Sequence, residues 1–156
     1  MPRDPTPGAD SGMIVSGEFP GTPDGVREAL FDVRSALTAL HTGEEERFSA
    51  ELVIAEALNN VVEHALNGME HAAFYLSLQR SENGVLVDIR DSGRPMPTGC
   101  PPLGRAPALS VELAALPEGG FGWFLIRELA RDLEYGRVAE ENTLSFRLAI
   151  CHSEPA

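Results

Sequence analysis

The chain has 156 residues, of which 43% are hydrophobic and 23% are charged, and these fractions are ordinary for a globular protein. Its 24 acidic and 12 basic residues give a formal net charge of −12, a field that repels nucleic acid phosphates and disfavours direct DNA or RNA binding. No apolar run approaches the roughly 18 residues of a membrane span, so the sequence predicts a cytoplasmic protein that makes no membrane contact.

The ends of the chain differ in composition from its centre. Residues 1–12 are rich in proline and glycine and lack the apolar centre of a signal peptide, which predicts a disordered leader. Residues 13–151 are expected to form a single domain, long enough to bury a core without disulfides. Cys100 and Cys151 do not belong to a closely spaced set of metal ligands, which favours two unrelated thiols over a metal site.

The first elements in chain order are a short strand and two helices. Residues 13–19 alternate in polarity as an edge strand does. Apolar residues recur at helical spacing over 24–41, with Asp24 as the expected N-cap. A second helix is predicted over 44–66, because acidic residues at its start favour the positive end of the helix dipole.

The next segments are a hairpin and a long irregular loop. Residues 71–79 and 85–90 are predicted strands joined by an Asn-Gly turn. Residues 91–118 are rich in proline and glycine and leave room for only a short helix at 109–116. A loop of this length in a compact domain is usually functional, often as a lid, or else disordered.

The last elements are a third helix over 122–131 and strands over 132–138 and 143–150. The predicted order is therefore β-α-α-β-β-loop-α-β-β. Adjacent strands with short connections imply a mixed, mainly antiparallel sheet with the helices grouped on one face. The predicted fold class is α+β, a two-layer α/β sandwich.

A polar line crosses the otherwise apolar second helix. It consists of residues spaced at i, i+4, i+7 and i+11, which share one side: Glu56, Asn60, Glu63 and Asn67. The carboxamide oxygen of Asn60 can ligate Mg²⁺, and Glu56 can polarise a water or hydroxyl that attacks a phosphate. A solvated helix face explains the same spacing, and from the helix alone it is the preferred interpretation.

A carboxylate follows the second hairpin strand. Asp91 can project into a cleft while Gly93 lets the chain turn closely past a ligand. A carboxylate at such a place accepts a hydrogen bond from an exocyclic amine, which favours adenine over guanine. An ordinary Asx turn that ends the strand is the alternative, because the sequence Asp-Ser-Gly is common.

Three glycines precede the third helix. Gly119, Gly120 and Gly122 could present backbone N–H groups and a helix N-terminus to an anion, or could serve close packing or a hinge. A P-loop is excluded because no Gly-Lys-Ser/Thr follows, and a Rossmann site is excluded because the βαβ setting is missing. Arg127, further along the helix, could approach a phosphate, but a surface salt bridge is the preferred expectation.

Together these segments resemble the GHKL, or Bergerat-fold, ATPases, and within them the small bacterial anti-sigma-factor serine/threonine kinases. Three motifs carry the resemblance: AEALNNVVEHA (55–65), VDIRDSGRPMP (87–97), and GGFGWFLIRELARDLEYGR (119–137) with Asn142 and Thr143 beyond it. The second is similar to the family's D-x-G-x-P-x-P form. The likeness spans about residues 14–150, and the combination is far more specific than any one motif.

The resemblance implies an ATP-dependent protein serine/threonine kinase that uses Mg²⁺. Glu56 would be the general base or water-orienting carboxylate, and Asn60 the Mg²⁺ ligand. The γ-phosphate would pass to a serine or threonine of a STAS-type anti-sigma antagonist, and the protein would also sequester a sigma factor. A homodimer is implied as well.

The resemblance also implies how the nucleotide is surrounded. Asp91 would contact the adenine amino group, and Gly93 would give the ring room. Gly120 and Gly122 would lie along the phosphates, with residues 98–118 as the ATP lid.

Trp123 departs from the family pattern, because a smaller aliphatic residue usually stands there, and its bulk could narrow the phosphate end of the pocket. Other functions stay open beside the kinase. A non-catalytic, nucleotide-sensing switch would gate a partner without phosphorylating it, and a degenerate relative would bind no nucleotide. A self-contained histidine kinase is not expected, since no upstream helix pair with a phospho-acceptor histidine is seen in the sequence.

Overall fold

The computed structural model describes residues 12–102 and 121–150. Its elements in chain order are β1 (Met13–Pro20), α1 (Pro23–Ala39), α2 (Glu44–Asn60), η1 (Val61–Ala65), β2 (Ala73–Ser81), β3 (Gly84–Asp91), α3 (Phe121–Leu129), β4 (Ala130–Val138) and β5 (Glu141–Leu148). This is the predicted order, with a π-helical turn added after α2. The predicted leader and the short helix at 109–116 lie outside the described residues, so the domain bounds 13–151 stay a prediction.

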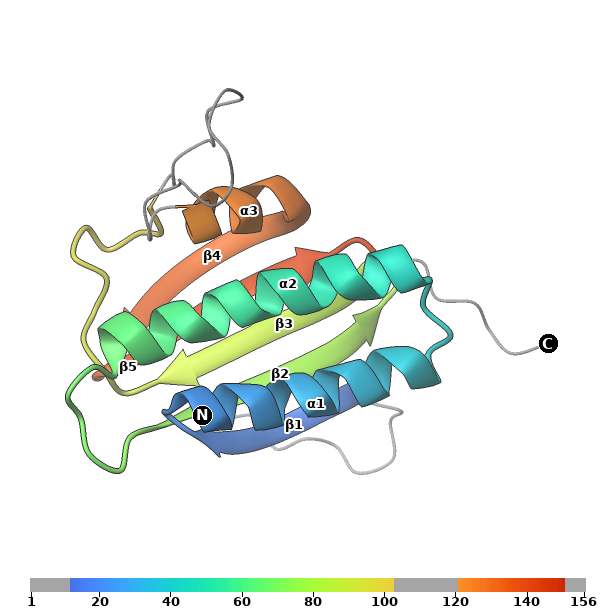
Figure 1. Ribbon diagram of the computed structural model, residues 1–156. Coiled ribbons are helices and arrows are strands. Elements are labelled where there is room, and N and C mark those ends of the chain that lie inside the picture. The colour runs from blue at the N-terminus through green and yellow to red at the C-terminus, as the bar shows by residue number, and fades with distance from the viewer. Residues whose placement is uncertain (1–11, 103–120, 151–156) are drawn as a thin grey trace, which may run out of the picture.

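Five strands form one sheet in the order β1-β2-β3-β5-β4 (Figure 1). Every pairing between them is antiparallel, so the described sheet has none of the parallel pairs that the predicted mixed sheet allowed. The chain leaves β3, passes through α3 to the edge strand β4, and returns as β5 between the two. This crossing brings the end of β3 beside the start of β5.

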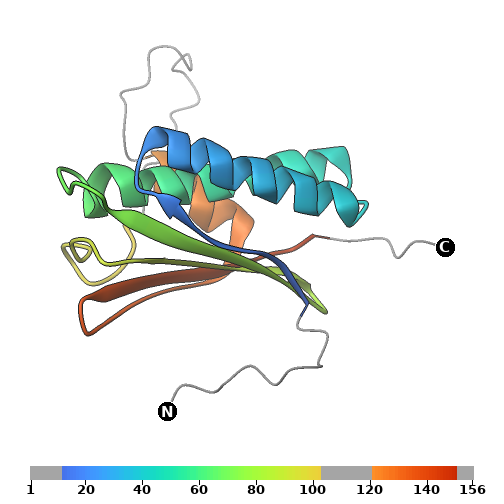
Figure 2. The same ribbon diagram turned by 90° about the horizontal axis from the view of Figure 1, so that it is seen from below.

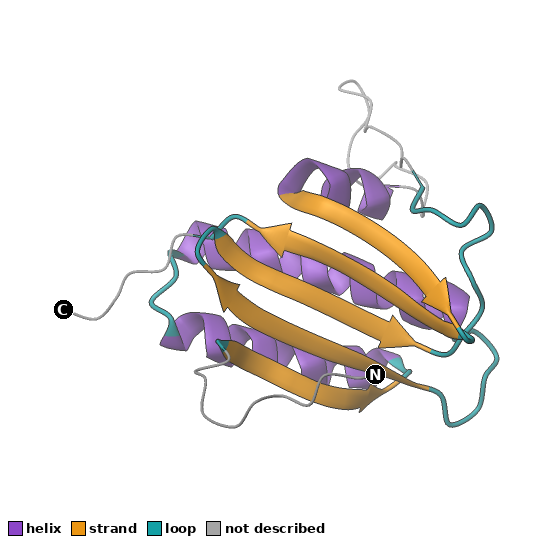
Figure 3. Ribbon diagram, turned by 180° about the vertical axis from the view of Figure 1, so that it is seen from behind, coloured by secondary structure: helices purple, strands orange, loops and turns teal. Residues whose placement is uncertain are grey.

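The helices cover one face of the sheet, which confirms the predicted two-layer α+β sandwich (Figure 2). α1 and α2 run side by side over the sheet, and α3 lies beside α2 and next to the edge strand β4 (Figure 1). The opposite face carries no helix of the described part of the chain (Figure 3). None of the helices described is long and apolar enough to cross a membrane.

The start of α1 differs from the prediction. Thr22, not Asp24, is the N-cap: its side-chain oxygen accepts a hydrogen bond from the Gly25 N–H at 3.0 Å. Pro23 follows at the first helical position, where its missing N–H costs no hydrogen bond. Asp24 lies within the first turn and pairs with Arg27 at 2.8 Å on the surface. Both Thr22 and Asp24 suit a cap, and the proline between them decides the choice.

The core lies between the helices and the sheet. Apolar side chains repeat every three or four residues along α1 and α2 and every second residue along the strands, as the periods of helix and strand require. The largest fully buried side chains come from both layers: Leu37, Ile54, Leu58, Phe74, Leu76, Leu78, Ile89 and Ile126. A packed core of this kind holds the ends of α2, β3, α3 and β5 in fixed relation to one another.

Candidate functional site

The polar residues of α2 face the beginning of α3. The Asn60 side-chain NH₂ donates to the backbone carbonyl of Glu56 at 2.9 Å, and within the described part of the chain this leaves the Asn60 Oδ1 atom for a ligand. A Cβ atom on Gly122 would collide with Glu56 Oε2 and lie 3.6 Å from Asn60 Nδ2. Both α2 side chains are half-buried, so the solvated-face interpretation is wrong for them. The fold joins the first predicted motif to the third.

Two electrostatic effects act on the Glu56 carboxylate. Partial burial raises its pKa above the ordinary value, and the negative charge of Glu63 raises it further. A carboxylate with a raised pKa is a stronger base once it is ionised, which suits it to accept a proton from a hydroxyl. Glu63 itself is exposed and acts on Glu56 through its charge.

The turn after Asn60 is wider than an α-helix. It is the π-helical segment η1, in which the Leu66 N–H donates to the Val61 carbonyl at 2.9 Å. The predicted length of this helix is nearly right, but its last turn is not α-helical. Short π segments inside α-helices often occur at functional sites, where the wider turn changes which groups face the neighbouring chain.

The segment after β3 packs against the end of η1. The Arg94 N–H donates to the Ala65 carbonyl at 2.9 Å. A Cβ atom on Gly93 would collide with the same carbonyl. Glycine is therefore required here by the close approach of two backbones, a reason that the sequence alone did not reveal.

Asp91, the last residue of β3, is almost completely buried, with 7% of its surface exposed. Its Oδ1 atom accepts hydrogen bonds from the Gly93 N–H at 2.8 Å and from Asn142 Nδ2 at 2.9 Å. The first of these is the predicted Asx turn, so the turn and the buried carboxylate are both present. Among the described residues both bonds are made by Oδ1, which leaves Oδ2 to a ligand.

Burial raises the pKa of Asp91 above its ordinary value. The hydrogen bonds from Asn142 and Gly93 and the positive charge of Arg137 lower it, and the charge of Glu141 adds a small increase. Burial is the largest of these effects, so this carboxylate holds its charge at a cost. A ligand that donates a hydrogen bond to Oδ2 would offset part of that cost.

Asn142 is a site residue that sequence reasoning missed. It was noted only as part of the closing strands, yet it is 3% exposed and bonds directly to Asp91. The two residues lie opposite each other in the antiparallel register of β3 and β5. Because β3 and β5 are far apart in sequence, the contact between Asp91 and Asn142 follows only from the strand order. The sequence itself offers one hint of it, a polar asparagine at the start of the last strand.

Several sequence predictions fall on other parts of the glycine-rich region. Gly119, Gly120 and most of the predicted lid at 98–118 lie outside the described residues. Trp123 is 7% exposed and belongs to the hydrophobic core. Among the described residues Arg127 does not form the expected salt bridge. Its guanidinium instead donates to two backbone carbonyls, that of Pro101 at 2.6 Å and that of Pro102 at 2.8 Å.

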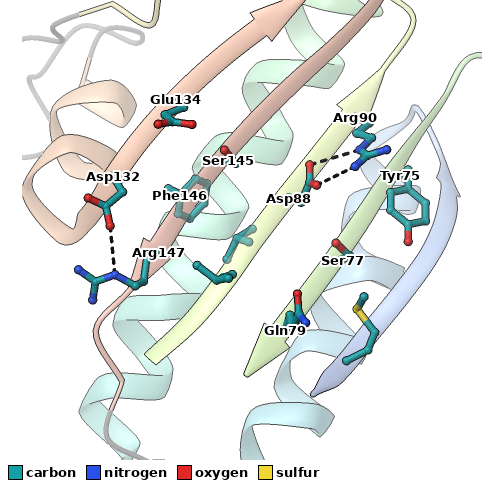
Figure 4. Close-up of a pocket in the computed structure, with 13 residues that line it drawn as sticks. Tyr75, Ser77, Gln79, Asp88, Arg90, Asp132, Glu134, Ser145, Phe146 and Arg147 are labelled. Carbon is teal, nitrogen blue, oxygen red and sulfur yellow. Dashed lines mark hydrogen bonds and ion pairs between the residues drawn. The ribbon is translucent and has the colours of Figure 1, made fainter. Parts of the chain in front are cut away.

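A separate hollow of about 520 Å³ opens on the helix-free face of the sheet (Figure 4). Two ion pairs lie along it: Arg90 with Asp88 of the same strand at 3.1 Å, and Arg147 with Asp132 at 3.2 Å. Asp91 lies on the other face, because side chains alternate along β3. The hollow is therefore not part of the site around Glu56 and Asp91.

The donor atoms of the site suit a hard cation bound together with an anion. The described residues hold no cluster of three or more histidine, cysteine or acidic side chains that could enclose a metal ion. Mg²⁺ does not need such a cage, since it keeps several waters and takes one or two protein oxygens together with ligand phosphates. The Asn60 Oδ1 atom, with Glu56 close by, fits that requirement.

Comparison with known sequences identifies relatives. The profile of the histidine kinase-like ATPase domain family matches residues 19–148. The serine/threonine-protein kinase BtrW of Bordetella bronchiseptica is 33% identical over 109 residues, which cover 70% of this chain and 72% of that protein. The region matched by the family profile includes all three sequence motifs.

Comparison with solved structures shows the same fold. A chain of the SiaB–SiaC complex from Pseudomonas aeruginosa matches this chain with a TM-score of 0.59 and 18% identity. The match covers 90% of this chain and 92% of that one. The structure of the RsbU and RsbW domains of a Mycobacterium tuberculosis protein matches with a TM-score of 0.56 and 14% identity over 91% of this chain. The chain spans only 34% of that mycobacterial protein. At these identities the likeness concerns the fold alone.

Proposed function

The chain belongs to the histidine kinase-like ATPase domain family, and on that premise we propose that it is an anti-sigma-factor-like protein serine/threonine kinase that binds Mg-ATP. The observation that carries the proposal is the meeting of Glu56, Asn60 and Gly122, which joins a base, a cation ligand and a helix N-terminus. The kinase relative at 33% identity supports the same reaction class.

In this proposal each end of the nucleotide has its own residues. The free Oδ2 atom of Asp91 accepts a hydrogen bond from the adenine amino group. The backbone at Gly120 and Gly122 lies along the phosphates, where the N-terminus of α3 favours negative charge. Asn60 would hold Mg²⁺, which would supply positive charge beside the phosphates.

Glu56 has the proposed catalytic role. It accepts the proton of the attacking serine or threonine hydroxyl, or orients that hydroxyl toward the γ-phosphate. Its raised pKa supports the role, because burial and Glu63 make the ionised carboxylate more basic. Phosphoryl transfer of this kind depends on position and charge more than on covalent chemistry.

The proposed protein partners are a STAS-type anti-sigma antagonist as substrate and a sigma factor as the sequestered protein. The support is the resemblance to anti-sigma kinases together with a structural neighbour that was solved in complex with a second protein. A net charge of −12 also suits a partner with basic patches. We propose a homodimer on the same resemblance.

The test is phosphate transfer from Mg-ATP to a STAS-domain protein encoded beside this chain. Replacing Glu56 by Gln keeps the shape but removes the base, so we expect transfer to fall by about 10²- to 10⁴-fold while the ATP dissociation constant changes little. Glu45→Gln is the matched control, an exposed glutamate at the start of the same helix that should leave transfer unchanged.

Two other results would contradict the kinase proposal. Wild-type protein that binds ATP but transfers no phosphate to a STAS partner, while binding that partner in a nucleotide-dependent way, would be a non-catalytic switch. Protein that shows no Mg-ATP thermal shift would be a degenerate relative, since a ligand at 100 times its dissociation constant adds roughly 2.7 kcal/mol to the stability.

A further inference from the structure

Asn142 occupies the centre of a row of polar residues that runs across three strands. In the sheet register it lies opposite Asp91 of β3 on one side and Arg137 of β4 on the other. It is 3% exposed and faces the helix-covered side of the sheet, as its neighbour two residues along, Leu144, does. A carboxamide buried this deeply is costly unless all of its polar atoms are bonded.

The Asn142 side chain uses its full bonding capacity. Its Nδ2 atom donates to Asp91 Oδ1 and to the Arg94 carbonyl, each at 2.9 Å. Its Oδ1 atom accepts from the Tyr135 hydroxyl at 2.7 Å and from the Arg137 guanidinium at 2.8 Å. Two donors and two acceptor sites are thereby engaged. Asn142 has nothing left for a ligand and can influence one only through its neighbours.

The same neighbours also hold the backbone that follows Asp91. The Tyr135 hydroxyl accepts a hydrogen bond from the Met96 N–H at 3.0 Å, and Arg137 donates to the Gly93 carbonyl at 2.9 Å. Together with the bond from Asn142 to Arg94, these contacts tie residues 93–96 to β4 and β5. The segment beside the Asp91 carboxylate is thus held by side chains from two other strands.

We propose that Asn142, supported by Tyr135 and Arg137, is a positioning residue that fixes the Asp91 carboxylate and so sets the preference for adenine over guanine nucleotides. This inference rests on the proposed function. With Oδ1 held by Asn142, Oδ2 is presented in one orientation as a hydrogen-bond acceptor. Adenine offers an amino group to such an acceptor, whereas guanine offers a carbonyl oxygen, which the carboxylate repels.

The residue type matches the role. Aspartate in place of Asn142 would set a second carboxylate against Asp91, and alanine would leave Oδ1 of Asp91 without one of its two donors. A carboxamide is the side chain that donates to the carboxylate and at the same time accepts from Tyr135 and Arg137.

The experiment compares dissociation constants for Mg-ATP, Mg-GTP and Mg-tripolyphosphate by calorimetry in the full chain. Asn142→Ala is the main variant, and Tyr135→Phe is a milder one that removes a single hydroxyl from the network. Ser145→Ala is the matched control, because Ser145 lies on the same strand but lines the hollow on the opposite face. Circular dichroism confirms that each variant is folded.

For Asn142→Ala we expect the Mg-ATP dissociation constant to rise about tenfold, as loss of a hydrogen bond to a charged group predicts. Binding of Mg-tripolyphosphate, which lacks a base, should stay unchanged, and the ratio of GTP to ATP dissociation constants should fall toward one. Tyr135→Phe should change the same ratio in the same direction by a smaller factor, and it carries the test if Asn142→Ala does not fold.

Equal losses for ATP, GTP and tripolyphosphate would overturn the inference, because they would mean that Asn142 only stabilises the fold. An unchanged ratio in folded Asn142→Ala or Tyr135→Phe would overturn it as well. Failure of the wild-type protein to bind ATP is a different result, since it refutes the proposed function itself, whereas the other outcomes leave ATP binding by the wild type intact.

Discussion

At the scale of single residues, Asp91 is a buried carboxylate with 7% of its surface exposed, and its Oδ1 atom accepts two hydrogen bonds. Burial raises its pKa, so the ionised form carries a desolvation cost that a donor bonded to Oδ2 would offset. The sequence predicted the position of this aspartate and its Asx turn. It could not predict Asn142 as a partner, because that contact depends on which strands are neighbours.

Replacing Asp91 by Asn tests base recognition. The new side chain can still accept from Gly93 and Asn142 through its oxygen, but it places an NH₂ group where Oδ2 was. We expect ATP affinity to fall by about tenfold or more and GTP to be tolerated better, as calorimetry would measure. Asp88→Asn, on the open face of the same strand, is the control and should bind ATP normally.

The Asp91→Asn substitution should also change how the stability of the protein depends on pH. The pKa of Asp91 is raised above 3.8 in the folded protein, so near this pH the folded state binds more protons than the unfolded state. The stability that this proton uptake contributes is fully present at low pH and is lost as pH rises through the raised pKa. The Asp91→Asn protein should therefore gain stability relative to wild type between acidic and neutral pH. Urea unfolding across that range would show the difference, and a relative loss would contradict the sign.

A substitution at Glu63 tests whether Glu56 is the base, because the charge of Glu63 raises the pKa of Glu56. Neutralising it as Glu63→Gln removes one of the two causes that raise the pKa of Glu56. If Glu56 must be ionised to act, the transfer rate rises with pH through its pKa, and the acidic limb should move to lower pH in the variant. The pH profile of transfer measures this shift, with Glu45→Gln as the distant control. An unmoved limb would exclude Glu56 as the titrating base.

At the scale of elements, the close approach of α3 to α2 decides the geometry of the site. Gly122→Ala would force Glu56 Oε2 aside, but that atom is the end of a flexible side chain, and alanine suits a helix better than glycine. We expect unfolding free energy to change by less than about 1 kcal/mol and phosphate transfer to fall by about tenfold or more.

Gly136→Ala is the control for this substitution. A Cβ atom at Gly136 in β4 would meet nothing within 4 Å, so both stability and transfer should stay near the wild-type values. Thermal unfolding and the transfer assay would be run on both variants. Normal transfer by a folded Gly122→Ala protein would show that the position of Glu56 against α3 is unimportant.

Most element boundaries followed from periodicity, because helices and strands bury one side at different spacings. The exceptions have local causes. The cap of α1 moved to Thr22 because Pro23 takes the first helical position. The π turn η1 ends at Ala65, whose carbonyl contacts residues 93–94, and this contact cannot be read from the helix sequence itself. β4 begins at Ala130, directly after α3, where a helical pattern conceals the boundary.

At the scale of the whole molecule, one face of the sheet holds the candidate site and the other holds the hollow with paired charges (Figures 3 and 4). Fold class and layer arrangement were predictable, because a half-buried antiparallel sheet needs helices on one side only. Strand order was not predictable from local patterns. It is the strand order that places Asn142 between Asp91 and Arg137.

The direct junction between α3 and β4 has one more consequence. α3 ends at Leu129 and β4 begins at Ala130, so one segment of the chain carries Gly122, which lies against Glu56, and also Tyr135 and Arg137, which bond to Asn142. Between these two groups the register of β4 shifts from Arg131 to Glu134. Two parts of the candidate site are therefore carried by one continuous segment, with the irregularity of β4 between them.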